Sequence, residues 1–290
     1  MTIGLMAVWW LACLLWSATF LFIRVGLAEI PPFTLAWIRL AIALAVLTPV
    51  AIARAELRTL RAIDVCRVAA AGLALLGVNY ALVFWGAQFI PSGLVAILQS
   101  GTPLIALGIA CVAGYEQVTS RKLVTLTLGI AGVAVIFGSE AAAAGQPAIK
   151  GVVAVLAGSL CVASAYVSMK GYGNRIAPLA LTTIQSAAAV VPLACVAFAL
   201  EGSPSPVQWS LSTWVAITYL GLAASVLAFG LNYWLLARMD ASAMLMMGVA
   251  EVPIAIVLGA VFLQERLPNG TFLGAACVLI AVVSSLLSRA

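Results

Sequence analysis

The chain has 290 residues, of which 65% are hydrophobic and only 8% are charged. Soluble domains carry roughly 25% charged residues, so this composition excludes a water-soluble protein and indicates an all-α membrane protein. The formal charge of +5 does not indicate a nucleic-acid partner, because in a membrane protein the position of Lys and Arg matters more than their sum.

Several kinds of catalytic and cofactor site are excluded by composition. The chain contains no histidine, which excludes His-ligated metal centres and Ser-His-Asp triads. None of its three lysines lies in a GxxxxGK phosphate loop. The six cysteines are scattered without CxxC spacing, a pattern typical of buried, unpaired side chains. We therefore expect no metal, no other cofactor and no enzymatic activity.

Uncharged apolar runs, separated by Arg, Pro, Gly and Asn, predict ten membrane-spanning helices of about 20 residues each. Residues 68–115 carry no charge and are too long for one span, so we expect a turn around Pro91. The predicted spans are 4–26, 31–53, 68–89, 92–114, 121–139, 151–170, 178–200, 213–236, 241–263 and 268–288.

The basic residues indicate which side of the membrane the termini occupy. An even number of spans places both termini on the same side. With the termini in the cytoplasm, ten of the fourteen Lys and Arg residues fall on the cytoplasmic side, as the positive-inside rule requires. The densest block is Arg54–Arg67. We expect a multi-pass protein of the bacterial inner membrane with cytoplasmic termini.

The two halves of the chain, 1–140 and 148–290, resemble each other and predict two five-helix repeats. In each half a proline, Pro103 or Pro253, precedes a glutamate, Glu116 or Glu265, by 13 and 12 residues respectively. Because each half holds an odd number of helices, the second repeat is inverted relative to the first. Inverted repeats recur in secondary transporters, which bind their substrate near the midplane.

Pro103 and Pro253 each fall near the middle of a predicted span, where we expect a kink. A proline inside a helix removes one backbone hydrogen bond and clashes with the preceding turn. The kinks either act as hinges during transport or shape a static packing.

In these features the sequence resembles the ten-helix members of the drug/metabolite transporter superfamily, which are built from two EamA-type repeats. The resemblance is carried by the two mid-helix prolines, the glutamates at helix ends, and small residues such as Gly129–Gly132 and Gly274–Ala276 in the last helix of each half. It implies ten helices around a central cavity, cytoplasmic termini and export of small metabolites. A particular likeness is to bacterial exporters of aromatic amino acids. The first span has no acidic residue, so the proton coupling of the small four-helix relatives does not carry over.

Charged side chains at membrane depth are costly and point to a functional site. Glu251 is about ten residues from either end of its span, and Arg39 is about eight residues into the second span. Arg39 could bind a substrate carboxylate, while Glu251 binds an ammonium group or carries a proton. Alternatively, the two neutralise each other or bind backbone carbonyls.

Uncharged polar and aromatic residues near mid-span are further candidates for substrate binding. Amides can orient a zwitterion, and aromatic rings suit a flat side chain or a cation. Helix–helix hydrogen bonding and packing are the alternative role for each. These residues are Trp16, Ser17, Asn79, Tyr80, Gln99, Tyr166 and Gln185.

We conclude that the chain is a secondary transporter that exports amino acids or similar small metabolites by alternating access. Its partners are the small-molecule substrate and the lipid bilayer, and a monomer is compatible with the sequence. An exporter of cationic drugs or purines is the alternative. Such cargo lacks a carboxylate and would leave Arg39 without a partner. An intramembrane enzyme using Glu251 alone, or a purely structural protein, is a weaker alternative.

The predicted topology can be tested with a cysteine introduced at Arg58 in a variant lacking the six native cysteines. This cysteine should resist a membrane-impermeant thiol reagent in intact cells, because the loop is expected in the cytoplasm. If the cysteine reacts as readily in intact cells as after lysis, the loop faces the outside and the assignment is reversed.

Overall fold

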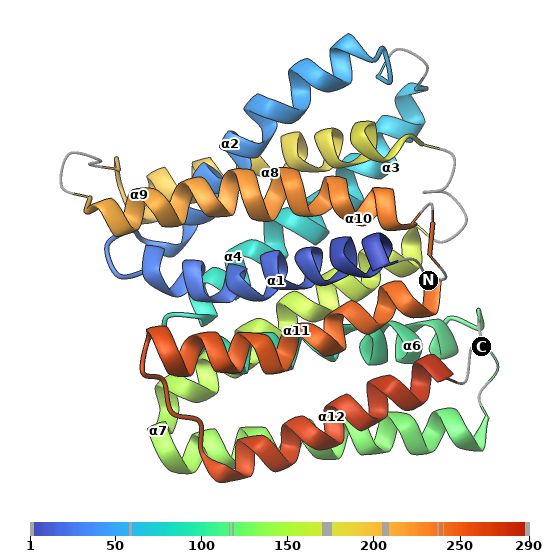
Figure 1. Ribbon diagram of the computed structural model, residues 1–290, viewed down its shortest axis with the longest axis vertical. Helices are drawn as coiled ribbons and strands as arrows, with labels where there is room; N and C mark the ends of the chain where they lie inside the picture. The colour runs from blue at the N-terminus through green and yellow to red at the C-terminus, as the bar shows by residue number, and fades with distance from the viewer. Residues whose placement is uncertain are drawn as a thin grey trace.

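The computed structural model describes residues 3–57, 60–115, 117, 119–169, 176–204, 209–236, 238–239 and 241–287. Every regular element within these ranges is helical (Figure 1). Eight helices are long and apolar enough to cross a membrane, and two shorter apolar helices, Met247–Phe262 and Asn269–Ser284, complete the predicted ten. The all-α, ten-span architecture is confirmed. Arg58, Glu116 and Lys170, on which part of the sequence argument depends, lie outside the described residues.

Ten spans follow from the order of the helices, some of which combine into one span. The first half contains α1(Ile3–Gly26), α2(Pro32–Ala53), a third span of α3(Ala62–Gly72), η1(Leu73–Val78) and α4(Asn79–Gly86), a fourth span of α5(Ser92–Ser100) and α6(Thr102–Val112), and the first arm of α7(Ser120–Ser168). The second half contains the second arm of α7, α8(Pro178–Leu200), an eighth span of α9(Leu211–Thr218), η4(Tyr219–Leu227) and α10(Ala228–Leu236), then α11(Ala241–Phe262) and α12(Asn269–Leu287).

The third span begins at Ala62, six residues before the predicted start at Val68. Asp64 lies in the first turn of α3, where a carboxylate interacts favourably with the N-terminal end of the helix dipole. The charged residues that suggested a loop therefore form the first turns of a helix.

The fifth and sixth spans are joined more tightly than the predicted linker between residues 140 and 148. They are the two arms of α7, and Gly145 is the residue with non-helical backbone angles between them, at φ 69° and ψ −152°. That conformation is accessible almost only to glycine. A single glycine therefore supplies the reversal between the two halves of the chain.

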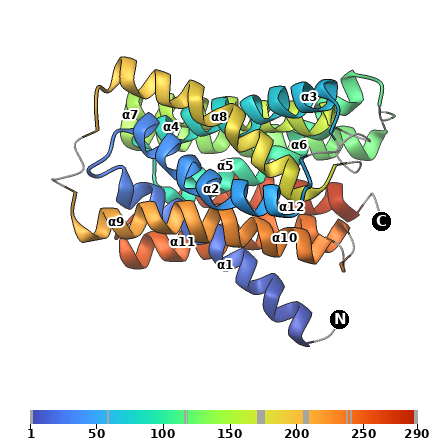
Figure 2. The same ribbon diagram turned by 90° about the horizontal axis from the view of Figure 1, so that it is seen from above.

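The first turn of α1 and the last turn of α12 lie at the same end of the bundle, which we call the terminal end (Figure 1). The connections α1–α2, α4–α5, α8–α9 and α11–α12 lie at the opposite, distal end. Seen from above, the first turns of α1 stand away from the other helices (Figure 2). The cytoplasmic location of the terminal end stays a prediction.

Small residues allow the last helix of each half to approach the other closely. A Cβ atom added at Gly132 of α7 would lie 2.8 Å from the backbone oxygen of Gly274 in α12, and one at Gly274 would lie 2.6 Å from the oxygen of Gly132. Without a hydrophobic driving force between helices in lipid, such backbone approach supplies much of the packing energy. The glycines of the two repeats thus meet face to face.

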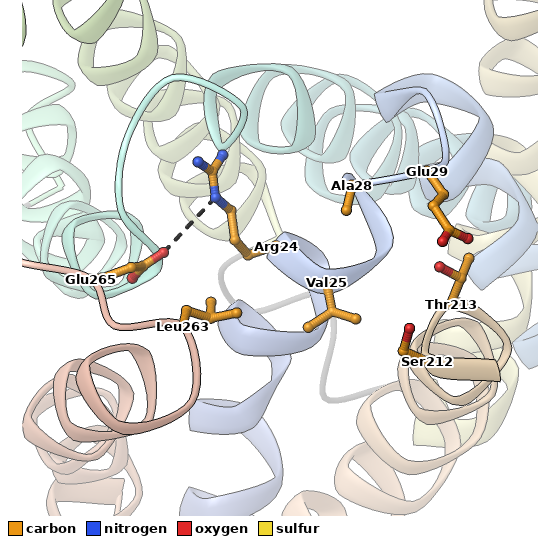
Figure 3. A pocket seen from close by; sticks show the side chains of 8 residues that line it. All are labelled: Arg24, Val25, Ala28, Glu29, Ser212, Thr213, Leu263 and Glu265. Atoms are coloured by element: carbon orange, nitrogen blue, oxygen red, sulfur yellow. Dashed lines mark ion pairs between the residues drawn. The ribbon is translucent and has the colours of Figure 1, made fainter. Parts of the chain in front are cut away.

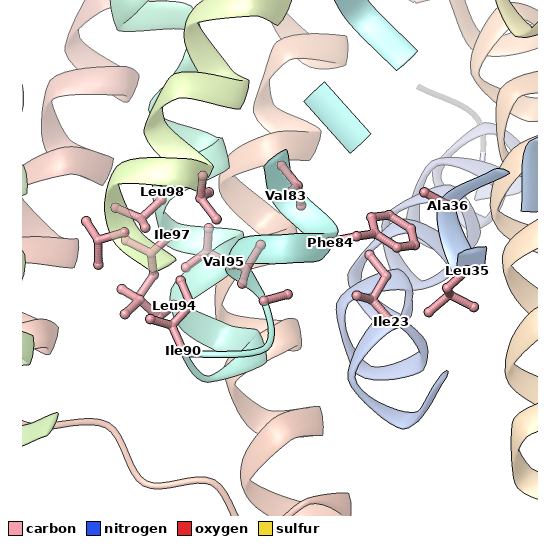
Figure 4. Packing of buried hydrophobic residues seen from close by; sticks show 14 of the residues in the cluster. Ile23, Leu35, Ala36, Val83, Phe84, Ile90, Leu94, Val95, Ile97 and Leu98 are labelled. Atoms are coloured by element: carbon pink, nitrogen blue, oxygen red, sulfur yellow. The ribbon is translucent and has the colours of Figure 1, made fainter. Parts of the chain in front are cut away.

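The main apolar core joins side chains from several spans, and part of it lies beneath the distal connections. Phe84 of α4 is fully buried and belongs to the same cluster as Ile23 of α1, Leu35 of α2 and Leu94 of α5. Figure 4 shows the Phe84 ring between α4 and the side chains of Ile23 and Ala36. The bundle is therefore densely filled close to its distal end.

Two glutamates at the distal end bind the N-terminus of a helix in the other repeat. The Glu201 carboxylate, just after α8, accepts the backbone N–H groups of Phe33 at 2.8 Å and Thr34 at 2.7 Å. The Glu265 carboxylate, just after α11, accepts the backbone N–H of Ser92 at 2.8 Å and its hydroxyl at 2.6 Å. The first N–H groups of a helix lack partners within the helix, so these carboxylates satisfy α2 and α5.

Two further glutamates act in the reverse direction, from the first repeat to the second. Glu29 accepts the backbone N–H of Ser210 at 2.8 Å, and this bond, with the Thr213 hydroxyl, holds the pKa of Glu29 below its ordinary value. The buried Glu140 accepts the hydroxyl of Thr271, in the first turn of α12, at 2.8 Å. The repeats are therefore joined at the distal end in both directions.

The two predicted hinge prolines have different surroundings. Pro103 is the second residue of α6, directly after the break at Gly101 that separates α5 from α6. Pro253 lies inside the continuous helix α11. The interruption of the fourth span supports a kink there, and a hinge role for both prolines stays a proposal.

Replacing Gly132 with alanine should destabilise the protein by about 1–3 kcal/mol, because the new Cβ would collide with the α12 backbone. The melting temperature in detergent measures this effect. Gly138→Ala is the matched control on the same helix, since a Cβ there meets nothing within 4 Å. Equal melting temperatures for the two variants would contradict the proposed close contact.

Candidate functional site

Arg39 lies on α2 with 3% of its surface exposed. Its Nε–H donates to the Ser225 hydroxyl at 2.9 Å, and its guanidinium lies 4.7 Å from the centre of the Tyr80 ring. Ser225 belongs to η4 and Tyr80 to α4, so three spans converge on this side chain. The structure thus brings together two predicted candidates, Arg39 and Tyr80.

The two spans that contact the Arg39 side chain each contain a π-helical segment. η1 ends one residue before Asn79 in the third span, and η4 occupies the middle of the eighth. In a π-helix the hydrogen bond runs from residue i+5 to residue i, and such segments are frequent at functional sites. Within η4 the Ser225 side-chain hydroxyl also donates to the carbonyl of Leu220, five residues earlier, at 2.8 Å. Having donated its proton, the Ser225 oxygen faces Arg39 as an acceptor.

Ser225 and Tyr219 are residues of this site that the sequence argument missed. Tyr219 stacks on Phe22 with 4.0 Å between ring centres and donates its hydroxyl to the Leu15 carbonyl of α1 at 2.8 Å. It lies on η4, six residues before Ser225. The sequence contains one pattern that could have pointed to the eighth span. The segment Gly77-Val78-Asn79-Tyr80 of the third span recurs there as Gly230-Leu231-Asn232-Tyr233.

The predicted amide residues mainly make contacts between helices. Gln99 of α5 donates to the Asn79 Oδ1 atom at 3.4 Å, and a Cβ added at Gly158 of α7 would lie 2.7 Å from that same oxygen. Gln185 of α8 is buried against Gly72 of α3. Asn79 and Gln99 form one pair, and Gln185 lies at a separate contact.

The remaining uncharged candidates are also distributed. Ser17 of α1 is buried and donates its hydroxyl to the Cys13 carbonyl within the same helix, at 2.7 Å. Trp16 packs edge to face against Phe229 of α10, at 5.8 Å between ring centres. Tyr166 is 60% exposed near the end of α7. The role of Tyr166 in substrate binding stays a prediction.

Glu251 and Arg39 do not form an ion pair. The ion pair found among the described residues joins Arg24 and Glu265. Glu251 lies on α11, which packs along α1. The two predicted charges therefore occupy separate environments, and mutual neutralisation does not explain either of them in this conformation.

Two cavities lie apart from Arg39 and Glu251. The first, of about 390 Å³, is at the distal end between α1, α9 and the α11–α12 connection, lined by Arg24, Glu29, Thr213 and Glu265 among others (Figure 3). The second is an apolar groove of about 900 Å³ between the fourth span, both arms of α7 and α12. None of the predicted substrate-binding residues lines either cavity.

Comparison with known proteins shows which family this chain matches and which proteins are similar to it. The profile described as "EamA-like transporter family" matches residues 2–138 and 149–287. The inner membrane transporter YedA of Escherichia coli K12, named as uncharacterized, is 28% identical over 277 residues, which cover 93% of this chain and 86% of that protein. The "probable amino-acid metabolite efflux pump" of the same strain is 24% identical over 279 residues, covering 93% and 90%.

A solved crystal structure has the same fold as this chain. It superposes with a TM-score of 0.66 and 20% sequence identity, and the match covers 100% of this chain and 99% of that one. At this identity the likeness concerns the fold alone.

The separation of Arg39 and Glu251 predicts additive effects on stability. The change in unfolding free energy for Arg39→Gln with Glu251→Gln should equal the sum of the single changes within about 0.5 kcal/mol, as for distant sites. Unfolding measured in detergent for the four proteins of the cycle tests this. A coupling energy of about 1 kcal/mol or more would show that the two charges interact.

Proposed function

The chain belongs to the EamA-like transporter family and is a multi-pass inner-membrane transporter, and we propose that it exports amino acids or similar small carboxylate-bearing metabolites by alternating access. The observation that carries this proposal is the buried Arg39 guanidinium, which has no carboxylate partner among the described residues. A buried cation is costly unless it is paired, and a substrate carboxylate would pair it.

The geometry around Arg39 favours a carboxylate with a flat side chain attached. A guanidinium binds a carboxylate through two parallel hydrogen bonds, and Arg39 uses its Nε–H on Ser225. Its terminal nitrogens have no hydrogen-bond partner among the described residues. The guanidinium lies over the Tyr80 ring, 4.7 Å from its centre, so an aromatic side chain borders the proposed carboxylate position, which supports aromatic amino acids as cargo.

Glu251 supports a second element of the proposal. An acidic side chain within a span, without a cationic partner among the described residues, is suited to binding a substrate ammonium or a proton. The same feature is the observation that favours the alternative cargo, cationic drugs, for which Glu251 and not Arg39 would be the main contact. Asn79, Gln99, Ser17 and Trp16 are proposed as further parts of the substrate path.

Uptake of labelled amino acids into proteoliposomes, with and without a pH gradient, tests the proposal. Arg39→Lys keeps the charge but loses the planar fork, and we expect transport to fall roughly 10-fold to 100-fold, as for the loss of a charge-assisted hydrogen bond. If Glu251 carries a proton, Glu251→Gln should remove the response to the pH gradient.

Arg238→Lys is the matched control, because Arg238 also lies over an aromatic ring, that of Trp234 at 4.2 Å, but is exposed. It should transport as the wild type does. Wild-type rates in Arg39→Lys would contradict the carboxylate site, and uptake restricted to cations or purines would favour the alternative.

A further inference from the structure

The fourth span and α11 are in unusually close contact at the distal end. A Cβ atom added at Gly93 of α5 would lie 3.2 Å from the Ile256 Cα and 3.6 Å from its Cβ. One added at Gly259 of α11 would lie 2.7 Å from the Ser92 hydroxyl oxygen and 2.6 Å from the Glu265 Oε2 atom. Glycine on each helix therefore permits the approach, and Ser92 is 2% exposed.

The Glu265 side chain, just after the end of α11, stabilises this contact by hydrogen bonds. Its Oε2 atom accepts both the backbone N–H and the hydroxyl of Ser92. Arg24 of α1 holds the carboxylate from the other side, with 3.9 Å between Nε and Oε1 (Figure 3). The same guanidinium donates to the carbonyls of Ala87 and Gln88, in the α4–α5 connection, at 2.8 and 2.9 Å. The end of α1 and two connections, α4–α5 and α11–α12, are thus joined around one carboxylate.

The two halves of the fourth span differ in their neighbours. Both α5, at the distal end, and α6, toward the terminal end, pack against α7 and α12, but among the described residues only α5 also packs along α11. The chain passes from one to the other at Gly101, directly before Thr102 and Pro103. The contact between the fourth span and α11 is therefore tight at one end of the membrane and not at the other.

We propose that the α5–α11 contact is the gate of the distal end, and that Glu265, bound to Ser92, is the latch that keeps it closed in this conformation. This inference rests on the proposed alternating access. Opening toward the distal side separates α5 from α11, with Gly101 as the point at which the fourth span bends.

The position of the latch suits repeated opening. The bonds lie at the end of the bundle, beside the cavity that contains Arg24 and Glu265, so water can solvate the carboxylate and the freed N–H group when they part. A hydrogen bond exchanged for water in this way shifts an equilibrium by only about 2-fold to 12-fold net, or up to roughly 150-fold with a charged partner. The latch therefore biases the gate toward closure without locking it.

A reversible disulfide tests whether this contact must open. In a background without native cysteines, Gly93→Cys with Ile256→Cys has the Cβ separation of a disulfide, 3.6 Å. Transport by the oxidised protein should fall in proportion to the crosslinked fraction and return on reduction. The control pair is Gly129→Cys with Ala281→Cys, at 3.8 Å between α7 and α12, which should transport equally well when crosslinked.

The latch is tested without any substrate, by labelling Gly93→Cys with a polar thiol reagent in detergent. Glu265→Gln should increase the labelling rate roughly tenfold, for a loss of about 1.4 kcal/mol. Glu201→Gln is the control, since Glu201 also binds a helix N-terminus at the distal end but does not touch α5. Ser92→Ala, which removes only the hydroxyl bond, should give a smaller increase if Glu265→Gln folds poorly.

The outcomes separate this inference from the proposed cargo. If amino acids are not the cargo, the reduced protein will not transport them, while the labelling results will still hold. Normal transport by the crosslinked Gly93–Ile256 pair, or equal inhibition by the control pair, would overturn the gate. Labelling that is unchanged by both Glu265→Gln and Ser92→Ala would overturn the latch.

Discussion

Hydrocarbon offers no hydrogen-bond partner to a polypeptide backbone, and this constraint governs the structure throughout. The membrane-spanning residues are helical because only helices and closed barrels satisfy all backbone groups internally. Where the helical pattern is interrupted, a local substitute is present. The Ser225 hydroxyl donates to a carbonyl within η4, and the helices that begin at the distal end receive N-terminal partners from glutamates of the other repeat. The helical spans and the side-chain hydrogen bonds where helices are interrupted thus both follow from the need to satisfy backbone groups.

The same constraint links the fold to the candidate site. π-helical geometry in η4 orients the Ser225 hydroxyl toward Leu220, so that its oxygen faces Arg39. The close approach of α7 and α12 at Gly132 and Gly274 requires no polar side chain and holds the outer part of the bundle. Polar side chains instead make their contacts where helices break, bend or end. The candidate site around Arg39 contains such a contact, with Ser225 in η4.

Sequence reasoning could predict the spans and the repeats, because the length of an apolar run and the recurrence of prolines, glutamates and small residues are visible along the chain. It also identified Arg39 and Tyr80, since charge and aromaticity within a span are visible in the residues themselves. It could not predict that Arg39 and Glu251 do not form an ion pair with each other, or that Ser225 contacts Arg39. Those depend on helix rotation and on backbone geometry, which neighbouring helices determine. The glutamates at helix ends were visible as residues, but their partners lie far away in the sequence.

The unpaired Arg39 has a consequence for how the membrane voltage acts on the protein. Arginine keeps its positive charge in proteins, and a unit charge moved across the full membrane potential gains or loses about 2.3 kcal/mol per 100 mV. With a carboxylate bound, as proposed, guanidinium and anion form a neutral pair on which the field does no net work. In the empty carrier the field acts on Arg39 itself, whereas in a carrier loaded with an amino acid it acts on the substrate ammonium and on Glu251, the proposed ammonium contact.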